Sequence, residues 1–399
     1  MSKRAGLASL EALVLGSPVS FKKFASTTVA AACSCATDAN ARVQFQALQL
    51  LGCLCNKHKL YKLQEAFPRE ILTSICSLMC SPCMRISNHA CNALISFCRA
   101  DGSENCVESD LLLPYLEGIL RALGDGPLSS ASKVGSVEGA EALMIAGINA
   151  LACVADVVGR EFQPHYASFM PGLLSCVKLG LDEHARPVNP REDSVMAILR
   201  GTAIEAASIM GEAVGGNESQ DFLRDATSLM HFVLAYLALA NQVAMADAAS
   251  SAPGASPAGR IKMCLPIPMD KVQASCARIS GMMGSDFAQF MPSVLPHLLR
   301  QVKAKNDMSV TEGDEAGLEA TNKGEVERDL DMGTESMTMN IPGVGIKKLT
   351  LNTTVIQEKS QAARALYEHG EFLLGALCKS CIAANAADAA CPAVCDASI

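Results

Sequence analysis

Residues 41–51 read ARVQFQALQLL, and residues 84–94 read MRISNHACNAL. In each stretch the second and third residues are Arg and a branched apolar residue, an Ala follows four residues later, and the stretch ends in an apolar pair. The second copy begins 43 residues after the first. Apolar residues at this spacing form one stripe on an α-helix, so both stretches are expected to be helical. A helical pattern that returns after about 40 residues indicates an array of stacked repeats rather than one compact core.

A second recurrence supports the array. The pattern Gly-x2-Phe-x8-Pro-x-Leu-Leu occurs twice, as Gly159, Phe162, Pro171 and Leu173-Leu174, and again as Gly284, Phe287, Pro296 and Leu298-Leu299. We expect the Gly to end the first helix of a pair and the Phe to anchor the entry into the second. The predicted fold class is therefore all-α, a superhelical HEAT/armadillo-type α-solenoid of antiparallel helix pairs.

Helical patterns fill most of the chain, and no stretch reads as a convincing alternating strand. The predicted pairs are 3–16 with 19–36, 41–56 with 68–81, 84–100 with 109–124, 137–158 with 161–181, 193–214 with 219–241, and 269–283 with 286–304, and a last helix covers 355–382. The predicted organisation is HEAT repeats over 1–245 (about five helix pairs), a flexible linker over 246–262, a HEAT repeat over 263–305, an acidic disordered insertion over 306–350, and a partial HEAT repeat and tail over 351–399.

Composition narrows the class of protein. Half of the 399 residues are hydrophobic, and the net charge of −8 argues against a protein that coats nucleic acid. The N-terminus lacks the apolar core of a signal peptide, and no uninterrupted apolar run reaches membrane-spanning length, so no membrane insertion is expected. Most of the 18 Cys fall inside helical apolar patterns, which favours reduced, buried thiols in the cytosol or nucleus.

Motifs for chemistry are scarce. The sequence contains no P-loop, His-Glu-x2-His, Gly-x-Ser-x-Gly or dinucleotide-binding glycine motif. The run from Gly343 to Lys347 reads as a mobile loop. Cys76, Cys80, Cys83 and His89 have a spacing that could supply zinc ligands, but the first two lie on an apolar helical stripe and read as buried thiols. We expect no metal, no cofactor and no catalysis.

The net negative charge is concentrated between residues 307 and 335, which hold ten acids and two bases. The candidate ligand-binding acids in this insertion are Glu312, Asp314, Glu315, Glu325, Glu327, Asp329 and Asp331. A mobile polyanion can attract a basic ligand and speed its capture. A solvated linker would have the same composition, and the sequence leaves both interpretations open.

The second helices of the pairs supply further candidates. In a solenoid such helices line the concave side, where successive repeats present an extended binding surface. Glu70, Glu117, Asp225, Ser228 and Gln289 are the candidate binding residues on these helices, and His165 and His297 are further positions expected to be exposed.

The order of these features resembles the importin-beta (karyopherin-beta) family of nuclear transport receptors, in particular the middle repeats of the importin-five branch. The resemblance is carried by residues 3–7, by Leu112-Leu113-Pro114-Tyr115-Leu116, by 161–171, by 199–215, and by Gly345-Ile346-Lys347 leading to Glu358-Lys359-Ser360.

The resemblance implies a receptor, or a fragment of one, that binds basic nuclear-localisation signals on its concave face and shuttles between cytoplasm and nucleus through the nuclear pore. It implies cargo proteins and nucleoporins as partners. It also implies Ran GTPase as a partner, although the family's N-terminal Ran-binding repeats have no counterpart here. The alternative is a HEAT scaffold or adaptor of another assembly, of the phosphatase or vesicle-coat type.

Overall fold

The computed structural model describes residues 3–99, 107–179, 194–250 and 268–303, four strands between 308 and 352, and a few isolated helical residues between 356 and 370. The chain divides into two compact units, Met1–Met282 and Met283–Ile399. Each unit is described by itself.

The first unit consists of helices. Its main elements are α1 (Lys3–Gly16), α2 (Pro18–Phe21), η1 (Lys22–Phe24), α3 (Ala25–Ala36), α4 (Ala41–Cys55), α5 (His58–Tyr61), α6 (Leu63–Ala66), α7 (Pro68–Met79), α8 (Met84–Cys98), α9 (Leu116–Asp125), η5 (Leu128–Lys133), α10 (Ala140–Val158), α11 (Gln163–Lys178), α12 (Ser194–Ala213), α13 (Gln220–Ser250) and α14 (Met269–Met283). These elements confirm the predicted α-solenoid.

The helix ends follow the predicted rules. Gly159 and Gly284 have φ of 57° and 63°, the left-handed region that favours glycine, and each ends a helix. Phe162 and Phe287 are buried just after them. At the start of α4, the side chain of Asn40 accepts a hydrogen bond of 2.9 Å from the backbone N–H of Arg42 and caps the helix.

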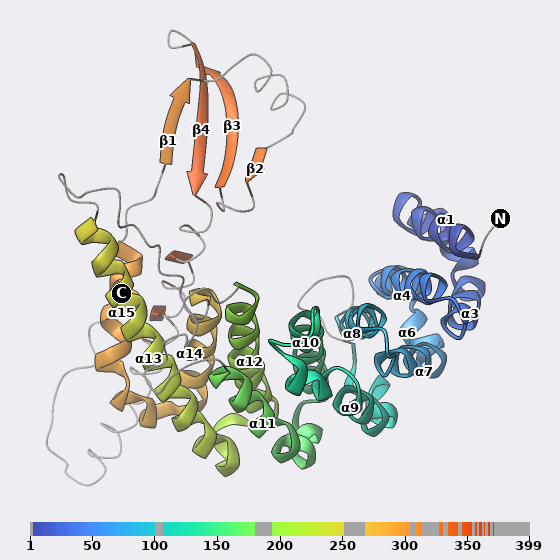
Figure 1. Ribbon diagram of the computed structural model, residues 1–399, viewed down its shortest axis with the longest axis horizontal. Coiled ribbons are helices and arrows are strands. Elements are labelled where there is room, and N and C mark those ends of the chain that lie inside the picture. Colours follow the sequence, from blue (N-terminus) through green and yellow to red (C-terminus); the bar gives the residue numbers. More distant parts are fainter. Residues whose placement is uncertain are drawn as a thin grey trace, which may run out of the picture. The chain divides into compact units, whose positions relative to one another are not determined.

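The helices of the first unit lie in two layers (Figure 1). The helices α1, α4, α8, α10 and α12 contact one another in succession and form the layer called here the inner row, and α3, α7 and α9 do so in the second layer. Across the layers α3 packs on α4, α7 on α8 and α11 on α12. The packed pairs therefore start one helix later than the sequence pattern suggested. The reason is the length of the connections: only residues 37–40 join α3 to α4, and only residues 80–83 join α7 to α8.

Close packing explains the apolar character of the middle helices. Within the described chain, Ala140–Lys178 and Gln220–Leu239 are long and apolar enough to cross a membrane by length and composition, contrary to the expectation from the sequence. In the first segment, 72% of the most apolar window is buried inside the protein. Helix α10 contacts α8, η5 and α12, so it is apolar on nearly all sides for the same reason as any core helix.

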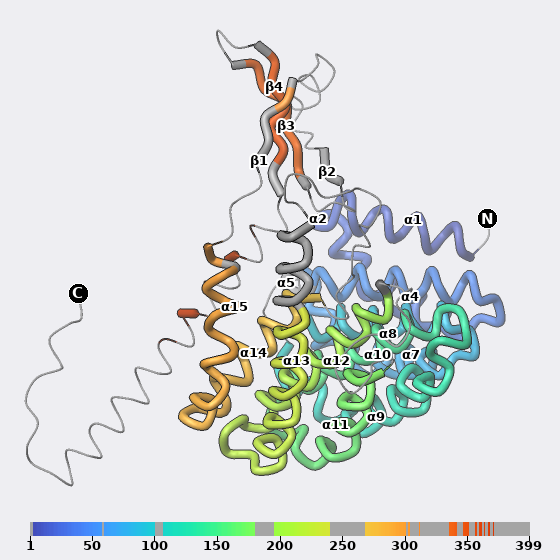
Figure 2. Tube along the Cα trace, turned by 60° about the vertical axis from the view of Figure 1, so that its left-hand side comes forward, coloured from blue at the N-terminus to red at the C-terminus, as the bar shows by residue number. Residues whose placement is uncertain are grey.

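The second unit contains η9 (Gly284–Gln289), α15 (Met291–Lys303) and a four-stranded antiparallel sheet (Figures 1 and 2). The strands are β1 (Met308–Glu312), β2 (Glu327–Asp329), β3 (Thr334–Ile341) and β4 (Gly345–Asn352), in the order β1-β4-β3-β2.

The sheet corrects two expectations. Residues 306–350 are not disordered throughout, and Gly345 to Lys347 begin a strand rather than belong to a loop. The missed signal is an alternation: Met337, Met339 and Ile341 in β3 are every second residue, as are two Leu residues in β4. The register sets Met337 opposite Leu349. Apolar and polar residues therefore alternate along β3 and β4, as in a strand, but each alternating run is short and was not read as a strand.

One predicted boundary also changes. Helix α13 runs to Ser250, so residues 246–250 are helical and do not belong to a flexible linker. Residues 251–262 of that linker lie outside the described residues. So does most of the helix predicted over 355–382.

Candidate functional site

The predicted second-helix residues lie apart from the inner row. Glu70 on α7 and Glu117 on α9 are exposed. On α13, Ser228 is exposed, and Asp225 accepts a 2.9 Å hydrogen bond from the hydroxyl of Tyr166. Asp225 therefore has a structural partner that the sequence did not reveal. The prediction that these residues bind cargo stays a prediction.

The candidates in the second unit differ from one another. Gln289 on η9 is exposed and donates a 2.9 Å hydrogen bond to the carbonyl of Asp286. His297 was expected to be exposed, and this is wrong: only 5% of it is accessible. Burial, together with the nearby charge of Arg300, lowers the pKa of His297 to about 4. It lies on the apolar stripe of α15, one residue before a buried Leu.

Three predicted acids of the insertion lie in strands. The backbone of Glu312 pairs with Lys347, and that of Arg328 with Glu335, so residues of opposite charge are placed on adjacent strands. Glu327 and Asp329 occupy the edge strand β2. Asp314, Glu315, Glu325 and Asp331 lie outside the described residues, and their binding role stays a prediction.

The inner row carries a different set of polar residues, which we call the polar line and define as Gln49, Asn92, Asn149 and Glu205. They come from α4, α8, α10 and α12, four helices that follow one another in contact. Gln49 and Asn92 are separated by the 43-residue repeat. Asn149 and Glu205 each lie ten residues before a left-handed Gly that follows its helix, at 159 and 215. All four are at least partly accessible, although most residues around them are buried.

At its α4–α8 end the polar line is flanked by a stack of rings and a guanidinium. The side-chain amide of Gln49 lies 3.2 Å from Nδ1 of His89. The ring of His89 meets that of Phe45 edge-on at 4.4 Å, and the guanidinium of Arg85 lies 4.9 Å from the Phe45 centroid. Burial and the charge of Arg85 lower the pKa of His89, which favours the neutral form of the imidazole.

At its other end the polar line is acidic. The carboxylate of Glu205 forms an ion pair with Lys271 of α14. About two turns further along α12, Glu212 lies 3.4 Å from the guanidinium of Arg278, which also donates a 2.7 Å hydrogen bond to Ser208. This end therefore already holds an ammonium and a guanidinium group supplied by the chain itself.

This arrangement suits an extended peptide. A side-chain amide offers both donors and an acceptor, so it can pair with a peptide's backbone C=O and N–H. Packed helices are about 8–10 Å apart, and an extended chain advances about 3.3 Å per residue. Each helix of the inner row would then meet about every third peptide residue. The carboxylates at the α12 end would select basic side chains.

Sequence reasoning missed the polar line because it searched for exposed polar residues on the predicted second helices. A signal was available: the same shift that aligns Arg42 with Arg85 also aligns Gln49 with Asn92. What the sequence could not supply was the pairing of helices, which decides the layer to which each helix belongs.

The thiols considered as zinc ligands have other surroundings. Burial raises the pKa of Cys76 to about 11. The exposed thiol of Cys80 donates to the carbonyl of Ala122 at 3.7 Å. His89 is engaged by Gln49, as described above. Within the part of the chain that the structure describes, no group of three His, Cys, Asp or Glu side chains could hold a metal ion.

Comparison with known proteins gives sequence relatives. No family model matches the chain. Importin subunit beta-3 of Saccharomyces cerevisiae is 25% identical over 339 residues, which cover 85% of this chain and 25% of that protein. A probable importin-5 homolog of Dictyostelium discoideum is 25% identical over 179 residues, 45% of this chain and 13% of that protein. The chain thus spans at most about a quarter of the length of these relatives.

Solved structures share the fold. Kap121p bound to Pho4p superposes with a TM-score of 0.66 at 21% identity, and Kap121p bound to Nup53p with 0.65 at 21% identity. Each match covers 94% of this chain and 29% of the other. The importin sequences and the shared karyopherin fold confirm the resemblance to the importin-beta family seen in the sequence.

Proposed function

We propose that this chain is a nuclear import receptor, or a segment of one, whose polar line binds an extended basic segment of a cargo protein. It acts by binding and not by catalysis. Its expected place is the cytoplasm and nucleus, with passage through the nuclear pore. Its expected partners are basic cargo proteins and nucleoporins, and Ran GTPase by family resemblance alone.

The observation that carries the proposal is the polar line itself. Gln49 and Asn92 are related by the 43-residue repeat, and Asn149 lies on the next helix of the inner row. These amides lead toward Glu205 and Glu212, which are paired with basic side chains of the chain itself. The relatives agree with this role: they are named as importins, and Kap121p has been crystallised bound to Pho4p, Ste12p and Nup53p.

A binding titration tests the proposal. A fluorescein-labelled, lysine-rich peptide of 12 to 15 residues is titrated with the protein and followed by anisotropy at low and high salt. The variant Asn92→Ala/Asn149→Ala removes two amides of the polar line without removing a charge. We expect its affinity to fall about tenfold, since each lost hydrogen bond contributes about 0.5–1.5 kcal/mol.

The matched control is Glu70→Gln/Glu117→Gln, which alters two exposed acids on α7 and α9. We expect it to bind the peptide as the wild-type protein does. If this control loses affinity while the amide variant does not, the peptide binds the second helices and the polar line is not the site. If the wild-type protein does not bind the basic peptide at either salt concentration, the import-receptor proposal itself fails, and the scaffold alternative gains support.

A further inference from the structure

Helix α14 continues the inner row beyond α12. A Cβ placed on Gly201 of α12 would come within 2.9 Å of the Pro268 ring and 3.2 Å of the Lys271 side chain, so the start of α14 lies directly against α12. Gly216, just after the end of α12, approaches Met282 near the end of α14 in the same way, and a Cβ there would lie 2.8 Å away. The two helices therefore run side by side in the same direction.

The accessible side of α14 carries small and basic residues. Lys271, Ala274 and Arg278 are three and four residues apart, so they share one face of the helix, and all three are partly accessible. The residues at 272, 273, 275 and 276 are buried. The surface that α14 adds beside α12 is therefore basic.

The two bases have the same spacing as the two acids that they meet. Lys271 and Arg278, called here the α14 bases, are seven residues apart, and so are Glu205 and Glu212, called here the α12 acids. Seven residues span about 10 Å along a helix. The ammonium of Lys271 lies 2.5 Å from the carboxylate of Glu205, and Nε of Arg278 lies 3.4 Å from that of Glu212. Each of the α12 acids is therefore neutralised by a base of the chain itself.

Both ion pairs are open to exchange. The side chains of Lys271 and Arg278 are 34% and 27% exposed, and those of Glu205 and Glu212 are 22% and 64% exposed. An ion pair that water reaches changes an equilibrium by at most about fivefold. A second ammonium or guanidinium group can therefore take the place of either α14 base.

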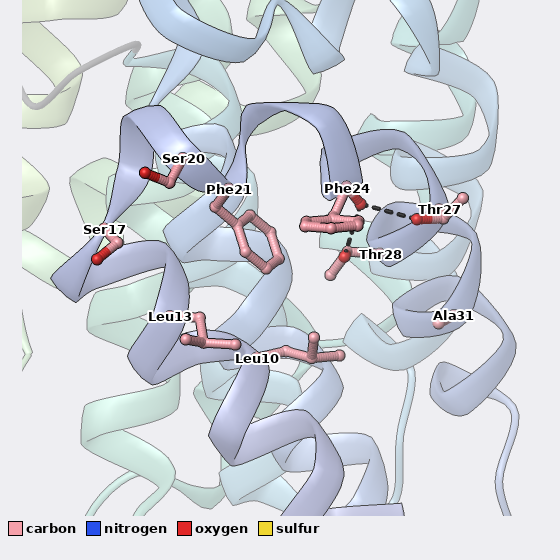
Figure 3. A pocket seen from close by; sticks show the side chains of 9 residues that line it. All are labelled: Leu10, Leu13, Ser17, Ser20, Phe21, Phe24, Thr27, Thr28 and Ala31. Atoms are coloured by element: carbon pink, nitrogen blue, oxygen red, sulfur yellow. Dashed lines mark hydrogen bonds between the residues drawn. The ribbon is translucent and has the colours of Figure 1, made fainter.

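Two cavities of the first unit would not serve a basic ligand in this way. One lies between α1 and the segment from α2 to α3 (Figure 3), and the other lies between η5 and α11. Both are lined by apolar, hydroxyl, thiol and glycine residues, without a charged side chain. A basic side chain of a ligand would instead have to compete for carboxylates such as the α12 acids.

We infer that the α14 bases act as internal competitors of the cargo. They hold the α12 acids in the free receptor, and a bound basic segment replaces them with its own basic side chains. The inference rests on the proposed function and adds a means of selection to it. A competitor on the same chain acts at a high effective concentration, so a freely diffusing basic group displaces it poorly. A segment already held by the amides of the polar line is tethered too, so its basic side chains compete on equal terms.

The test uses the labelled lysine-rich peptide described above and the variant Lys271→Gln/Arg278→Gln, followed by anisotropy at low salt. Removing two competitors, each worth up to about fivefold, should tighten binding about tenfold. Glutamine remains able to donate a hydrogen bond to a carboxylate, and unchanged circular dichroism would show that the variant is folded. Lys271→Arg keeps a base opposite Glu205 and should bind as the wild-type protein does.

The matched control is Arg160→Gln/Arg224→Gln. It also removes two positive charges from ion pairs, with Glu218 and Asp221, but both bases are exposed and neither lies on α14. We expect it to change the affinity less than twofold. A control that tightens binding as much as Lys271→Gln/Arg278→Gln would show that net charge is responsible, and the inference would fail.

A double-mutant cycle tests whether the competition is local. In a Glu205→Gln/Glu212→Gln background the α14 bases have no carboxylate to hold, so their replacement should no longer tighten binding. A full gain in that background would contradict the inference, and so would wild-type affinity in Lys271→Gln/Arg278→Gln itself.

The failure of this inference is distinguishable from that of the proposed function. If Asn92→Ala/Asn149→Ala weakens binding while replacement of the α14 bases has no effect, the polar line binds cargo without internal competition. If neither the wild-type protein nor Lys271→Gln/Arg278→Gln binds the peptide, the proposed function and the inference fail together.

Discussion

The packing of α12 against α13 leads to a prediction that distinguishes the effect of helix propensity on stability from the effect of side-chain packing. Gly211 lies inside α12, and a Cβ placed there would come within 2.0 Å of a ring carbon of Phe222 and 2.4 Å of two others. Carbon atoms in van der Waals contact are about 3.5–4.0 Å apart. In Gly211→Ala the ring must therefore move by about 1.5 Å. Phe222 is fully buried and cannot turn into solvent.

Two opposing effects determine how much Gly211→Ala changes the free energy of unfolding. Replacing a helical Gly by Ala stabilises a helix by about 1 kcal/mol. Overpacking a core costs about 1–3 kcal/mol, and the short distances at Gly211 place this variant at the upper end. We expect a net loss of about 2 kcal/mol. Gly172 in α11 is the matched control, because a Cβ there meets nothing within 4 Å. Gly172→Ala should gain about 0.5–1 kcal/mol.

Urea unfolding followed by far-UV circular dichroism measures both variants. With a slope of about 1–3 kcal/mol per molar urea, the midpoint of Gly211→Ala should fall by about 1 M. Phe222→Leu should cost less in the Gly211→Ala background than in the wild-type protein, since the smaller side chain relieves the contact. If Gly211→Ala is as stable as Gly172→Ala, the described packing of α12 on α13 is wrong.

Three further predictions concern single contacts. Tyr166→Phe removes the hydroxyl that donates to Asp225 and should lower the free energy of unfolding by about 1 kcal/mol, as measured by urea unfolding. Burial raises the pKa of Tyr166, so the wild-type protein should also lose stability above about pH 10, and Tyr166→Phe should lose less. Burial lowers the pKa of His297 to about 4 in the folded protein, so as the pH falls the unfolded chain takes up a proton before the folded one does. The free energy of unfolding should therefore fall by up to roughly 3 kcal/mol between about pH 6.5 and pH 4. His297→Leu should abolish this dependence, and a variant with the same pH profile as the wild-type protein would contradict the burial of His297. Asn40→Ala removes the cap of α4 and should cost about 1 kcal/mol, whereas Asn40→Asp should retain stability.

Sequence reasoning reached the solenoid because its signals are local. Gly159 and Gly284 end helices for reasons contained within a few residues, and the buried Phe three residues later repeats with them. Tertiary choices were harder to predict. Whether α4 packs on α3 or on α7 depends on the turn of the chain between them, and this choice decides which side chains share a surface. The candidate binding residues were therefore sought only on helices outside the inner row, and Gln49 and Asn92 were not considered.

The strands of the second unit show a different limit of prediction from the sequence. Acidic composition between residues 307 and 335 is a sound indicator of a solvated segment, yet the β3–β4 hairpin depends on short apolar alternations and on cross-strand pairing such as Met337 with Leu349. Such pairing is a property of two strands together, and neither strand alone was long or apolar enough to reveal it.

The central claim is that a basic peptide lies extended along the inner row. Photo-cross-linking tests it most directly: a lysine-rich peptide with one benzophenone side chain is bound to the wild-type protein, irradiated, and its attachment sites are mapped by mass spectrometry. The account predicts cross-links to α8, α10 and α12, close to Asn92, Asn149 and Glu205, that an excess of unlabelled peptide removes. Cross-links confined to α7, α9 and α13, near Glu70, Glu117 and Ser228, would contradict it.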